Sequence, residues 1–254
     1  MVDEPQKPRP LERVFFLSDP HIPYHDKRAL DLTFKVLRRF KPSVIVSMGD
    51  FVDFFSVSSF SKDPLRAFKL DSEIDAANKV LDQIDRSLPK RRIYLAGNHE
   101  DRLRRYLQDK APELFPFVDV QKLLRLEERG WEYVPYKAST KLGRVNLAHD
   151  VGSSTRYSVY RTLDTFQASV VTGHTHRLAY AVEGDARGNS HVGAQFGWLG
   201  DVRKVDYMHT VQARRNWALG FGYGYLRPDT GYVYLVPAPI VNYSVVVEGK
   251  LYST

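Results

Sequence analysis

The sequence predicts an α/β protein in the form of a four-layer αββα sandwich, with two mixed β-sheets packed together and flanked by helices. Three observations favour this fold class. Short apolar runs alternate with amphipathic segments through the first two-thirds of the chain, as strands and helices do in βαβ units. Beyond residue 177 the pattern changes to strands joined by turns. No repeat or linker separates the two parts, which favours a single domain.

The first elements predict a βαβ unit. Residues 13–18 form a short apolar run that ends in Asp-Pro, which is typical of a buried strand that stops at a loop. Apolar residues then recur at helical spacing over residues 27–40, and Lys41-Pro42 ends this pattern before a second apolar run at 43–48. A unit of this kind usually places its two strands parallel.

The later elements follow from the same patterns. Helical periodicity predicts helices over residues 71–88, 100–110, 117–129 and 154–166. Apolar runs predict strands over residues 92–96, 131–136, 144–148 and 168–172. Two hairpins are expected, at 178–183 with 190–196 and at 217–226 with 232–236. We expect residues 1–12 to be a flexible N-terminal lead and residues 13–254 to be one domain, in which the β-rich part 178–254 completes the second sheet.

Composition limits the chemistry of any functional site. The chain has 254 residues and no cysteine, which excludes disulfides, Cys-ligated zinc, iron–sulfur clusters and a Cys nucleophile. A metal would have to be held by His, Asp, Glu or Asn. The 37 Lys and Arg residues exceed the 30 Asp and Glu residues, giving a net charge of +7, and this mild excess suits an anionic partner such as a phosphate ester or nucleic acid.

No segment of the sequence predicts export or a membrane span. The N-terminus is polar and Pro-rich and lacks the apolar core of a signal peptide. The most apolar tract, residues 232–247, is interrupted by Pro, Asn and Ser. We therefore expect a soluble cytoplasmic protein with no membrane partner, and the sequence leaves its oligomeric state open.

Five polar segments follow the predicted strands. Ligands of open α/β sheets bind beyond the carboxyl ends of the strands, so these segments are expected to converge although they span more than half of the sequence. Five of the eight histidines fall within them. The segments are Asp19-Pro-His21, Gly49-Asp50-Phe-Val-Asp53, Gly97-Asn98-His99-Glu100, His149-Asp150 and Gly173-His174-Thr175-His176.

These residue types predict a two-metal site. Carboxylates and imidazoles suit Mn²⁺, Fe²⁺ and Zn²⁺, and Asn adds a neutral oxygen. Two ions about 3.5–4 Å apart need a shared ligand, and a carboxylate that follows a glycine, as Asp50 does, can approach both. We expect one ion to be held by Asp19, His21, His176 and the bridging Asp50. The second would be held by Asn98, His149, His174 and the same bridge.

His99 is needed by neither ion and is the natural proton donor. An imidazole beside two metals can stabilise a transferring phosphoryl group and protonate the leaving alkoxide, while a metal-bridging hydroxide attacks in line. His99 and Asp50 are therefore the expected catalytic residues. Asp53 is expected to orient the loop or a ligand histidine, and Glu100 to be a helix N-terminal charge. The role of Asp150 stays open.

The five segments resemble the calcineurin-like metallophosphoesterase superfamily, whose pattern is D-x-H, G-D-x-x-D, G-N-H-[ED], H and G-H-x-H. The match runs in order over roughly residues 13–180. The resemblance implies a two-sheet sandwich flanked by helices and gives His99 the role of phosphate-contacting proton donor. It implies two divalent metal ions as cofactors, Mn²⁺ first, with Fe, Zn²⁺, Ni²⁺ or Mg²⁺ as alternatives.

Two departures from the pattern narrow the function. Asp150 follows His149 where the family usually has Gly, which makes His149 the least secure of the expected ligands. Phe54-Phe55 follows Asp53 where the protein Ser/Thr phosphatases have Arg-Gly, and in those enzymes the Arg helps to hold phosphate. A protein phosphatase is therefore disfavoured, and the motif is more similar to those of the nuclease and small phosphodiesterase branches.

Basic residues gather around the third motif. Residues 86–110 hold eight basic and three acidic side chains, a local charge of 8 − 3 = +5. Arg102 and Arg105 begin the predicted helix after His99 and could meet phosphates beyond the scissile one, although a solvated helix face explains them equally well. Asn98 and His99 are also expected to contact substrate, and His25, near the first motif, is a further candidate.

The sequence thus predicts a two-metal hydrolase of phosphate esters that acts on nucleotide or nucleic-acid phosphate. A nuclease or phosphodiesterase acting on DNA or RNA is the alternative within enzymes. A binding module on a catalytically decayed phosphoesterase fold is the alternative outside them, and the presence of every expected ligand together with His99 argues against it.

Overall fold

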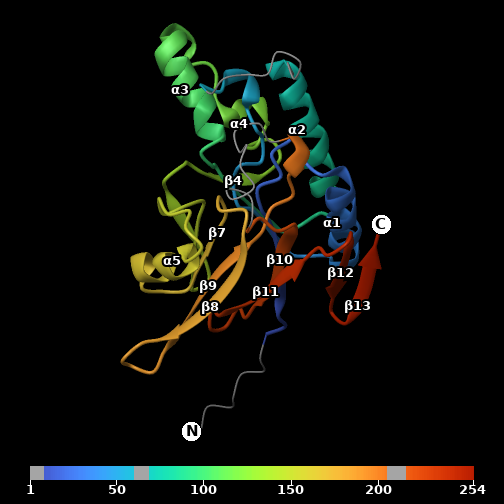
Figure 1. Ribbon diagram of the computed structural model, residues 1–254, viewed down its shortest axis with the longest axis vertical. Coiled ribbons are helices and arrows are strands. Elements are labelled where there is room, and N and C mark those ends of the chain that lie inside the picture. Colours follow the sequence, from blue (N-terminus) through green and yellow to red (C-terminus); the bar gives the residue numbers. More distant parts are fainter. Residues whose placement is uncertain (1–8, 60–68, 205–215) are drawn as a thin grey trace, which may run out of the picture.

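The computed structural model describes residues 9–59, 69–204 and 216–254. Two β-sheets pack face to face in the middle of the molecule (Figure 1). The first sheet has the strand order β11-β10-β1-β2-β3-β4. Its strands in chain order are β1 (Glu12–Leu17), β2 (Val44–Ser47), β3 (Arg91–Leu95), β4 (Trp131–Val134), β10 (Gly220–Leu226) and β11 (Val233–Pro239). Strands β1 to β4 are parallel to one another, whereas β10 runs antiparallel to both β1 and β11.

The second sheet has the strand order β5-β6-β7-β9-β8. Its strands are β5 (Ser139–Leu142), β6 (Val145–Ala148), β7 (Val170–Thr172), β8 (Leu178–Gly184) and β9 (Ser190–Phe196). Here β6, β7 and β9 are parallel, and the edge strands β5 and β8 are antiparallel to their neighbours. A separate hairpin of β12 (Ser244–Val247) and β13 (Lys250–Ser253) lies near the C-terminus.

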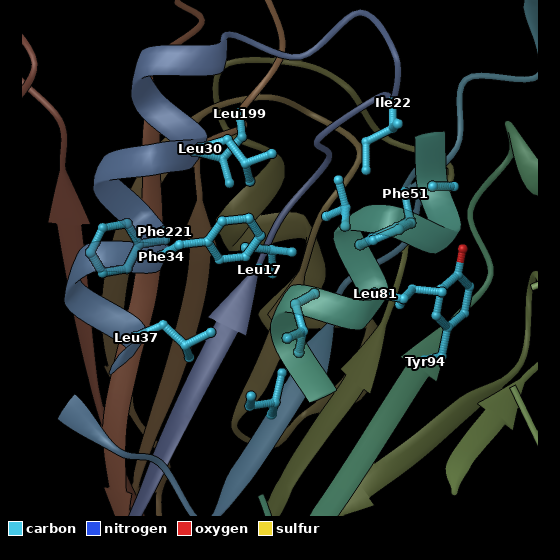
Figure 2. Packing of buried hydrophobic residues seen from close by; sticks show 14 of the residues in the cluster. Leu17, Ile22, Leu30, Phe34, Leu37, Phe51, Leu81, Tyr94, Leu199 and Phe221 are labelled. Atoms are coloured by element: carbon cyan, nitrogen blue, oxygen red, sulfur yellow. The ribbon is translucent and has the colours of Figure 1, made fainter. Parts of the chain in front are cut away.

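Helices cover the outer faces of both sheets. They are α1 (Lys27–Phe40), α2 (Leu70–Asp85), α3 (Glu100–Lys110), α4 (Val120–Leu123) and α5 (Ser158–Phe166). Helix α1 begins where the Asp26 side chain accepts a hydrogen bond from the Ala29 amide, and it ends at Lys41 in the left-handed conformation. The helix places apolar side chains against the first sheet, where Figure 2 shows Phe34 beside Phe221.

The alternation of side chains along β1 explains the layers. Val14 and Phe16 point toward the second sheet and join the core between the sheets, while Phe15 and Leu17 point toward the helices. A third apolar cluster packs α5 against the second sheet. The predicted four-layer αββα sandwich is therefore confirmed. No helix in the described ranges is long and apolar enough to cross a membrane.

The C-terminal strands correct one expectation. Strands β8 and β9 join the second sheet as expected, but β10 and β11 extend the first sheet instead of completing the second. The reason is the long-range pairing of β10 with β1, in which Gly222 lies opposite Phe16. Gly222 also lies where an added Cβ would be 2.3 Å from the Phe196 ring, so the Gly-aromatic alternation of β10 permits close packing between the sheets.

The prediction of one helix over residues 117–129 is also wrong. The structure forms only α4 there, because Asp119 caps its start and Arg125 adopts the left-handed conformation soon after its end. This turn allows both Leu124 and Leu126 to be fully buried. Helix α5 begins four residues later than the predicted start at residue 154, and β5, β12 and β13 were not predicted. The expected lead 1–12 falls largely outside the described residues, and Glu12 already belongs to β1.

Candidate metal centre

The predicted ligands come together where the strands of both sheets end. Loops after β1, β2 and β3 of the first sheet meet loops after β6 and β7 of the second. Because parallel strands carry their carboxyl ends at one edge, residues far apart in the sequence arrive at the same place. All seven residues expected to bind metal are found there.

One cluster consists of Asp19, His21, Asp50 and His176. Each residue contributes one ligand atom, and these atoms all lie within 4.8 Å of one another. All four residues are buried. His21 Nε2 lies 2.9 Å from His176 Nε2 and 4.0 Å from Asp50 Oδ2, so three donor atoms converge on one small volume.

A second cluster shares Asp50 with the first. His149 Nε2 lies 3.3 Å from Asp50 Oδ2, and His174 completes a group whose ligand atoms again fall within 4.8 Å. The side-chain oxygen of Asn98 lies 3.1 Å from His149 Nε2 and 2.7 Å from His174 Nδ1. The structure therefore brings three of the expected residues together on each side of Asp50. That these two sets bind two ions stays a prediction.

The ring of His149 is held in the orientation that a metal ligand needs. Its Nδ1 lies 2.7 Å from the Met48 carbonyl oxygen, which accepts a hydrogen bond from it. A carbonyl partner of this kind fixes the tautomer and leaves Nε2 available for an ion. His149 was the least secure ligand by sequence because Asp150 follows it. Asp150 instead accepts a hydrogen bond from the Gly152 amide at 2.8 Å, which gives it a role in the turn.

The donor atoms fit divalent ions. The buried Asp19 Oδ2 and His176 Nδ1 have no hydrogen-bond partner within the described part of the chain. A buried carboxylate oxygen without a partner is costly, and a cation would remove that cost. Carboxylate, imidazole and amide oxygen are donors typical of Mn²⁺, Fe²⁺ and Zn²⁺ sites, so the residues present suit the cofactors that the sequence predicted.

Backbone strain is concentrated in the residues of this site. Five candidate ligands have positive φ, although none is glycine. A residue held in this region costs on the order of 1–3 kcal/mol, and such residues cluster at functional sites. The five are Asp19 (φ 44°), His21 (49°), Asp50 (47°), His174 (65°) and His176 (57°).

Two glycines allow the loops to approach closely. An added Cβ at Gly97 would lie 2.1 Å from Asp50 Oδ1, and one at Gly49 would lie 2.3 Å from His149 Nδ1. Real Cβ atoms do not come so close, so any larger residue would push the bridging carboxylate or the His149 ring away. The glycines of the motifs are therefore required by packing around the donors.

Glu100 organises the loop that carries Asp50. Its buried carboxylate accepts hydrogen bonds from the amides of Asp50 (3.0 Å), Phe51 (2.9 Å), Val52 (3.0 Å) and Gly97 (2.7 Å). The Tyr94 hydroxyl donates a further one at 2.9 Å. The expectation that Glu100 is mainly a helix N-terminal charge is corrected, because the carboxylate holds the loops after β2 and β3 together. In the sequence, the glutamate that ends the G-N-H-E motif was the feature that could have indicated this role.

Asp53 orients two histidines, as expected for a residue that supports the ligands. One carboxylate oxygen lies 3.2 Å from His21 Nδ1 and 3.3 Å from His99 Nδ1. Burial raises the pKa of Asp53, but the hydrogen bonds with His21 and His99 outweigh burial and hold the pKa well below its usual range. Asp53 is therefore ionised and fixes the ring of the candidate ligand His21.

His99 lies against the shared carboxylate with Arg102 beside it. The His99 amide donates to Asp50 Oδ1 at 2.9 Å, and His99 Nε2 lies 3.9 Å from Asp50 Oδ2. Arg102 Nη2 lies 2.9 Å from His99 Nε2, and Arg102 Nη1 donates to the Asp53 carbonyl at 2.9 Å. Since a guanidinium can only donate, His99 Nε2 accepts, and His99 Nδ1 donates to the Asp53 carbonyl at 3.0 Å.

The charges around Asp50 are balanced by histidine. Burial raises the pKa of Asp50, but the charge of His149 and its hydrogen bond to the carboxylate outweigh burial and hold that pKa well below its usual range. Burial lowers the pKa of His149, whereas the Asp50 carboxylate raises it to about 10. Burial raises the pKa of Asp19 to about 7 and lowers the pKa of both His174 and His176. A divalent cation would displace the protons held here.

Of the remaining substrate candidates, Arg105 and His25 differ in their surroundings. Arg105 pairs with Asp101 at 3.1 Å and lines a pocket of about 200 Å³ together with Arg102. His25 pairs with Gly200 in an isolated β-bridge, and burial lowers its pKa to about 4. Among the described residues, no hydrogen bond or ion pair joins the His25 side chain to either cluster.

Two tryptophans near His176 were not predicted as part of the site. The ring of Trp198 stacks on His176 with a centroid distance of 4.6 Å and an interplanar angle of 12°. Trp217 contacts the same imidazole edge-on at 4.4 Å. These rings restrict the orientation of His176. Because their placement depends on loops distant in sequence, no local sequence pattern predicts it.

The two-sheet sandwich with buried Asp and His clusters at its strand ends defines a class of α/β protein with a candidate metal site. Comparison with known proteins is consistent with this class, since residues 12–204 match the family model of the calcineurin-like phosphoesterases. The chain belongs to this calcineurin-like phosphoesterase family.

Similar proteins span nearly the whole chain. The Gene 54 proteins of Mycobacterium phages L5 and D29 are each 26% identical to it, over 95% of this chain and 98% of theirs. Among solved structures, Vacuolar Protein Sorting 29 from Cryptosporidium parvum has 15% identity and a TM-score of 0.49, with 95% of this chain and 94% of that chain covered. Yfce, a phosphoesterase from E. coli, has 14% identity and a TM-score of 0.42, with 88% and 98% covered.

Proposed function

We propose that this protein is a metal-dependent hydrolase of phosphate esters that works with two divalent ions. The observation that carries the proposal is the pair of donor clusters that share Asp50, with His99 held against the same carboxylate. Asp19, His21 and His176 would hold one ion with Asp50, and Asn98, His149 and His174 the other. When bound, two such ions supply charge stabilisation and an activated water for phosphoryl transfer. Mn²⁺ is the ion we propose.

The protein's own groups supply the proton and the orientation. Asp53 fixes His99 through its carbonyl, and His99 Nε2 remains beside the Asp50 carboxylate. That nitrogen accepts a hydrogen bond from Arg102 in this structure, so a proton would have to replace this hydrogen bond before it could pass from His99 to the leaving alkoxide. General acid catalysis of this kind is worth about 10²–10⁴-fold in rate. Arg102 adds a positive charge next to the same nitrogen and would bind an oxygen of the phosphoryl group.

The surroundings of Arg102 favour a nucleotide or nucleic-acid substrate. The 200 Å³ pocket beside it is lined by Arg105, Lys110 and Tyr106, together with Ser58 and Ser59, and Asp109 is its one acidic lining residue within the described chain. Cationic side chains next to a catalytic centre suit phosphates beyond the scissile one. This observation supports the second candidate function, a nuclease or phosphodiesterase acting on DNA or RNA.

Hydrolysis assays test the proposal. Purified protein loaded with Mn²⁺ is given p-nitrophenyl phosphate, bis(p-nitrophenyl) phosphate, and single-stranded DNA and RNA. We expect cleavage of at least one substrate, abolished by Asp50→Ala and strongly reduced by His99→Ala, with Asp31→Ala on the exposed face of α1 as the control. If the loaded protein cleaves none of them, the enzymatic proposal is wrong. A binding module is then the better account only if Mn²⁺ is also not retained.

A further inference from the structure

A second pocket opens on the same edge of the first sheet. It has a volume of about 380 Å³ and lies between the carboxyl ends of β3 and β4, helix α3 and the segment before α4. Ligand pockets in proteins usually hold about 300–1,000 Å³, so this one is large enough for a small organic group. None of its lining residues is among the predicted metal ligands.

The pocket and the metal centre share a wall. Tyr136 lines the pocket, and its ring centroid lies 6.2 Å from that of the candidate ligand His149. Glu100 also lines the pocket and accepts the hydrogen bond from the amide of Asp50. When the phosphate of a molecule lies at the metal centre, the group attached to that phosphate can therefore reach the pocket.

Three aromatic rings form part of the walls of the pocket. Phe115, Tyr133 and Tyr136 line it. Tyr133 stacks on Tyr94 of the core with an interplanar angle of 22°, which fixes its ring. Phe115 is 39% exposed, although it is a large apolar side chain beside a concave surface. Rings arranged in this way suit a flat aromatic ligand, since stacking on aromatic side chains is tolerant of the ligand's identity.

The charges of the pocket argue against a second phosphate. Glu100, Asp101 and Asp119 line it together with the cations Arg104 and Lys137, so acidic residues outnumber basic ones. Arg104 is also engaged by Asp101 at 2.6 Å. A neutral ring with hydrogen-bonding edges fits these walls better than an anion does, because carboxylates accept hydrogen bonds from the ring N–H or amino groups of a base.

We infer that this pocket binds the base of a nucleotide ester whose phosphate lies at the metal centre. The inference rests on the proposed phosphoesterase function and deepens it by placing the base of the nucleotide substrate. It gives the substrate two points of attachment, the phosphoryl group at Asp50 and the base between Phe115 and Tyr136. A nucleoside ester should therefore be preferred over a simple alkyl ester with the same leaving group.

Two p-nitrophenyl diesters test the inference, thymidine 5′-(p-nitrophenyl phosphate) and methyl p-nitrophenyl phosphate. They share the leaving group and differ only in the nucleoside. We expect the ratio of their kcat/KM values to favour the thymidine ester by about tenfold or more in the Mn²⁺-loaded protein, as one stacked base predicts. Phe115→Ala should bring this ratio close to one. Phe117→Ala is the matched control, because Phe117 is 72% exposed and outside the pocket, and it should leave the ratio unchanged.

A binding measurement gives an independent readout. Calorimetric titration of thymidine 5′-monophosphate should show a dissociation constant about tenfold higher for Phe115→Ala than for Phe117→Ala, by the same stacking argument. Equal ratios and equal affinities in the two variants would overturn the inference while leaving phosphoester hydrolysis intact. Cleavage of neither diester, combined with a Phe115-dependent affinity, would instead count against the proposed function and support the base pocket.

Discussion

Arg102 Nη2 donates a hydrogen bond to Nε2 of His99 over 2.9 Å. The sequence placed Arg102 at the start of a helix where a solvated face explained it equally well. The structure instead buries the guanidinium between the Asp53 carbonyl and the histidine that we propose as proton donor. A phosphoryl group at the metal centre would therefore meet a histidine and an arginine that already touch each other.

Replacing Arg102 tests this arrangement. A hydrogen bond to a charged group contributes about 1.5–3 kcal/mol, so Arg102→Gln should lower kcat/KM for bis(p-nitrophenyl) phosphate by roughly 10–100-fold. Arg102→Lys keeps the charge and should recover part of the loss. Arg38→Gln, an exposed change on α1, serves as the control. An Arg102→Gln enzyme with unchanged kcat and KM would show that Arg102 is purely structural.

Asp53 should control metal affinity through His21. Its carboxylate holds His21 Nδ1 at 3.2 Å and so leaves Nε2 toward the first cluster. Removing a partner of this kind typically costs about 10–100-fold in metal affinity, and we expect Asp53→Asn to do so. Calorimetric titration with Mn²⁺ measures the change, with Asp31→Asn on the exposed face of α1 as the comparison. Equal affinities in the two variants would contradict this role.

Glu73 should make stability depend on pH. It is buried on α2 and accepts hydrogen bonds from the amides of Phe55 and Ser56, and burial raises its pKa from 4.5 to about 7. The folded protein therefore binds this proton more tightly than the unfolded chain does. The free energy of unfolding should fall as pH rises between these two values, by at most about 3 kcal/mol.

Urea denaturation at a series of pH values measures this effect. Glu73→Gln cannot ionise, so the difference in unfolding free energy between wild type and variant should change across the same pH range, with wild type losing stability relative to the variant as pH rises. Glu113→Gln, an exposed change, should give a constant difference. A difference that is also constant for Glu73→Gln would mean that the carboxyl group titrates alike in the folded and unfolded states.

Salt dependence should reveal contacts with distant phosphates. If Arg105 and Lys110 bind a single-stranded nucleic acid, the logarithm of the binding constant should fall with the logarithm of salt concentration by about 0.7 for each phosphate contact. The double variant Arg105→Gln/Lys110→Gln should then reduce the slope by about 1.4. Fluorescence anisotropy with a labelled oligonucleotide measures both slopes. Identical slopes would exclude these two residues from the substrate path.

The helices and strands that the local pattern of apolar residues determines were predictable from the sequence. Helix α1 and the strands around it follow directly from apolar periodicity, and the two donor clusters follow from the residues at the strand ends. The placement of β10 in the first sheet was not predictable, because it depends on pairing with β1 some two hundred residues earlier. No local pattern encodes such a pairing.

The residues that support the site were harder to assign than the donors themselves. Glu100 and Arg102 occupy the first turn of α3, where a charged residue is ordinarily explained by the helix end and by solvent. Their buried bonds to Asp50 and His99 appear only when the loop after β2 folds against that turn. The base pocket was hard to predict from the sequence for the same reason, because its aromatic residues come from separate elements.

Anomalous diffraction from crystals grown with Mn²⁺ tests the central claim most directly. We predict two peaks within coordinating distance of Asp50. One should be ligated by Asp19, His21 and His176, and the other by Asn98, His149 and His174. No peak at Asp50, or a single peak that uses only one of the two donor sets at saturating Mn²⁺, would contradict a two-metal centre in this protein.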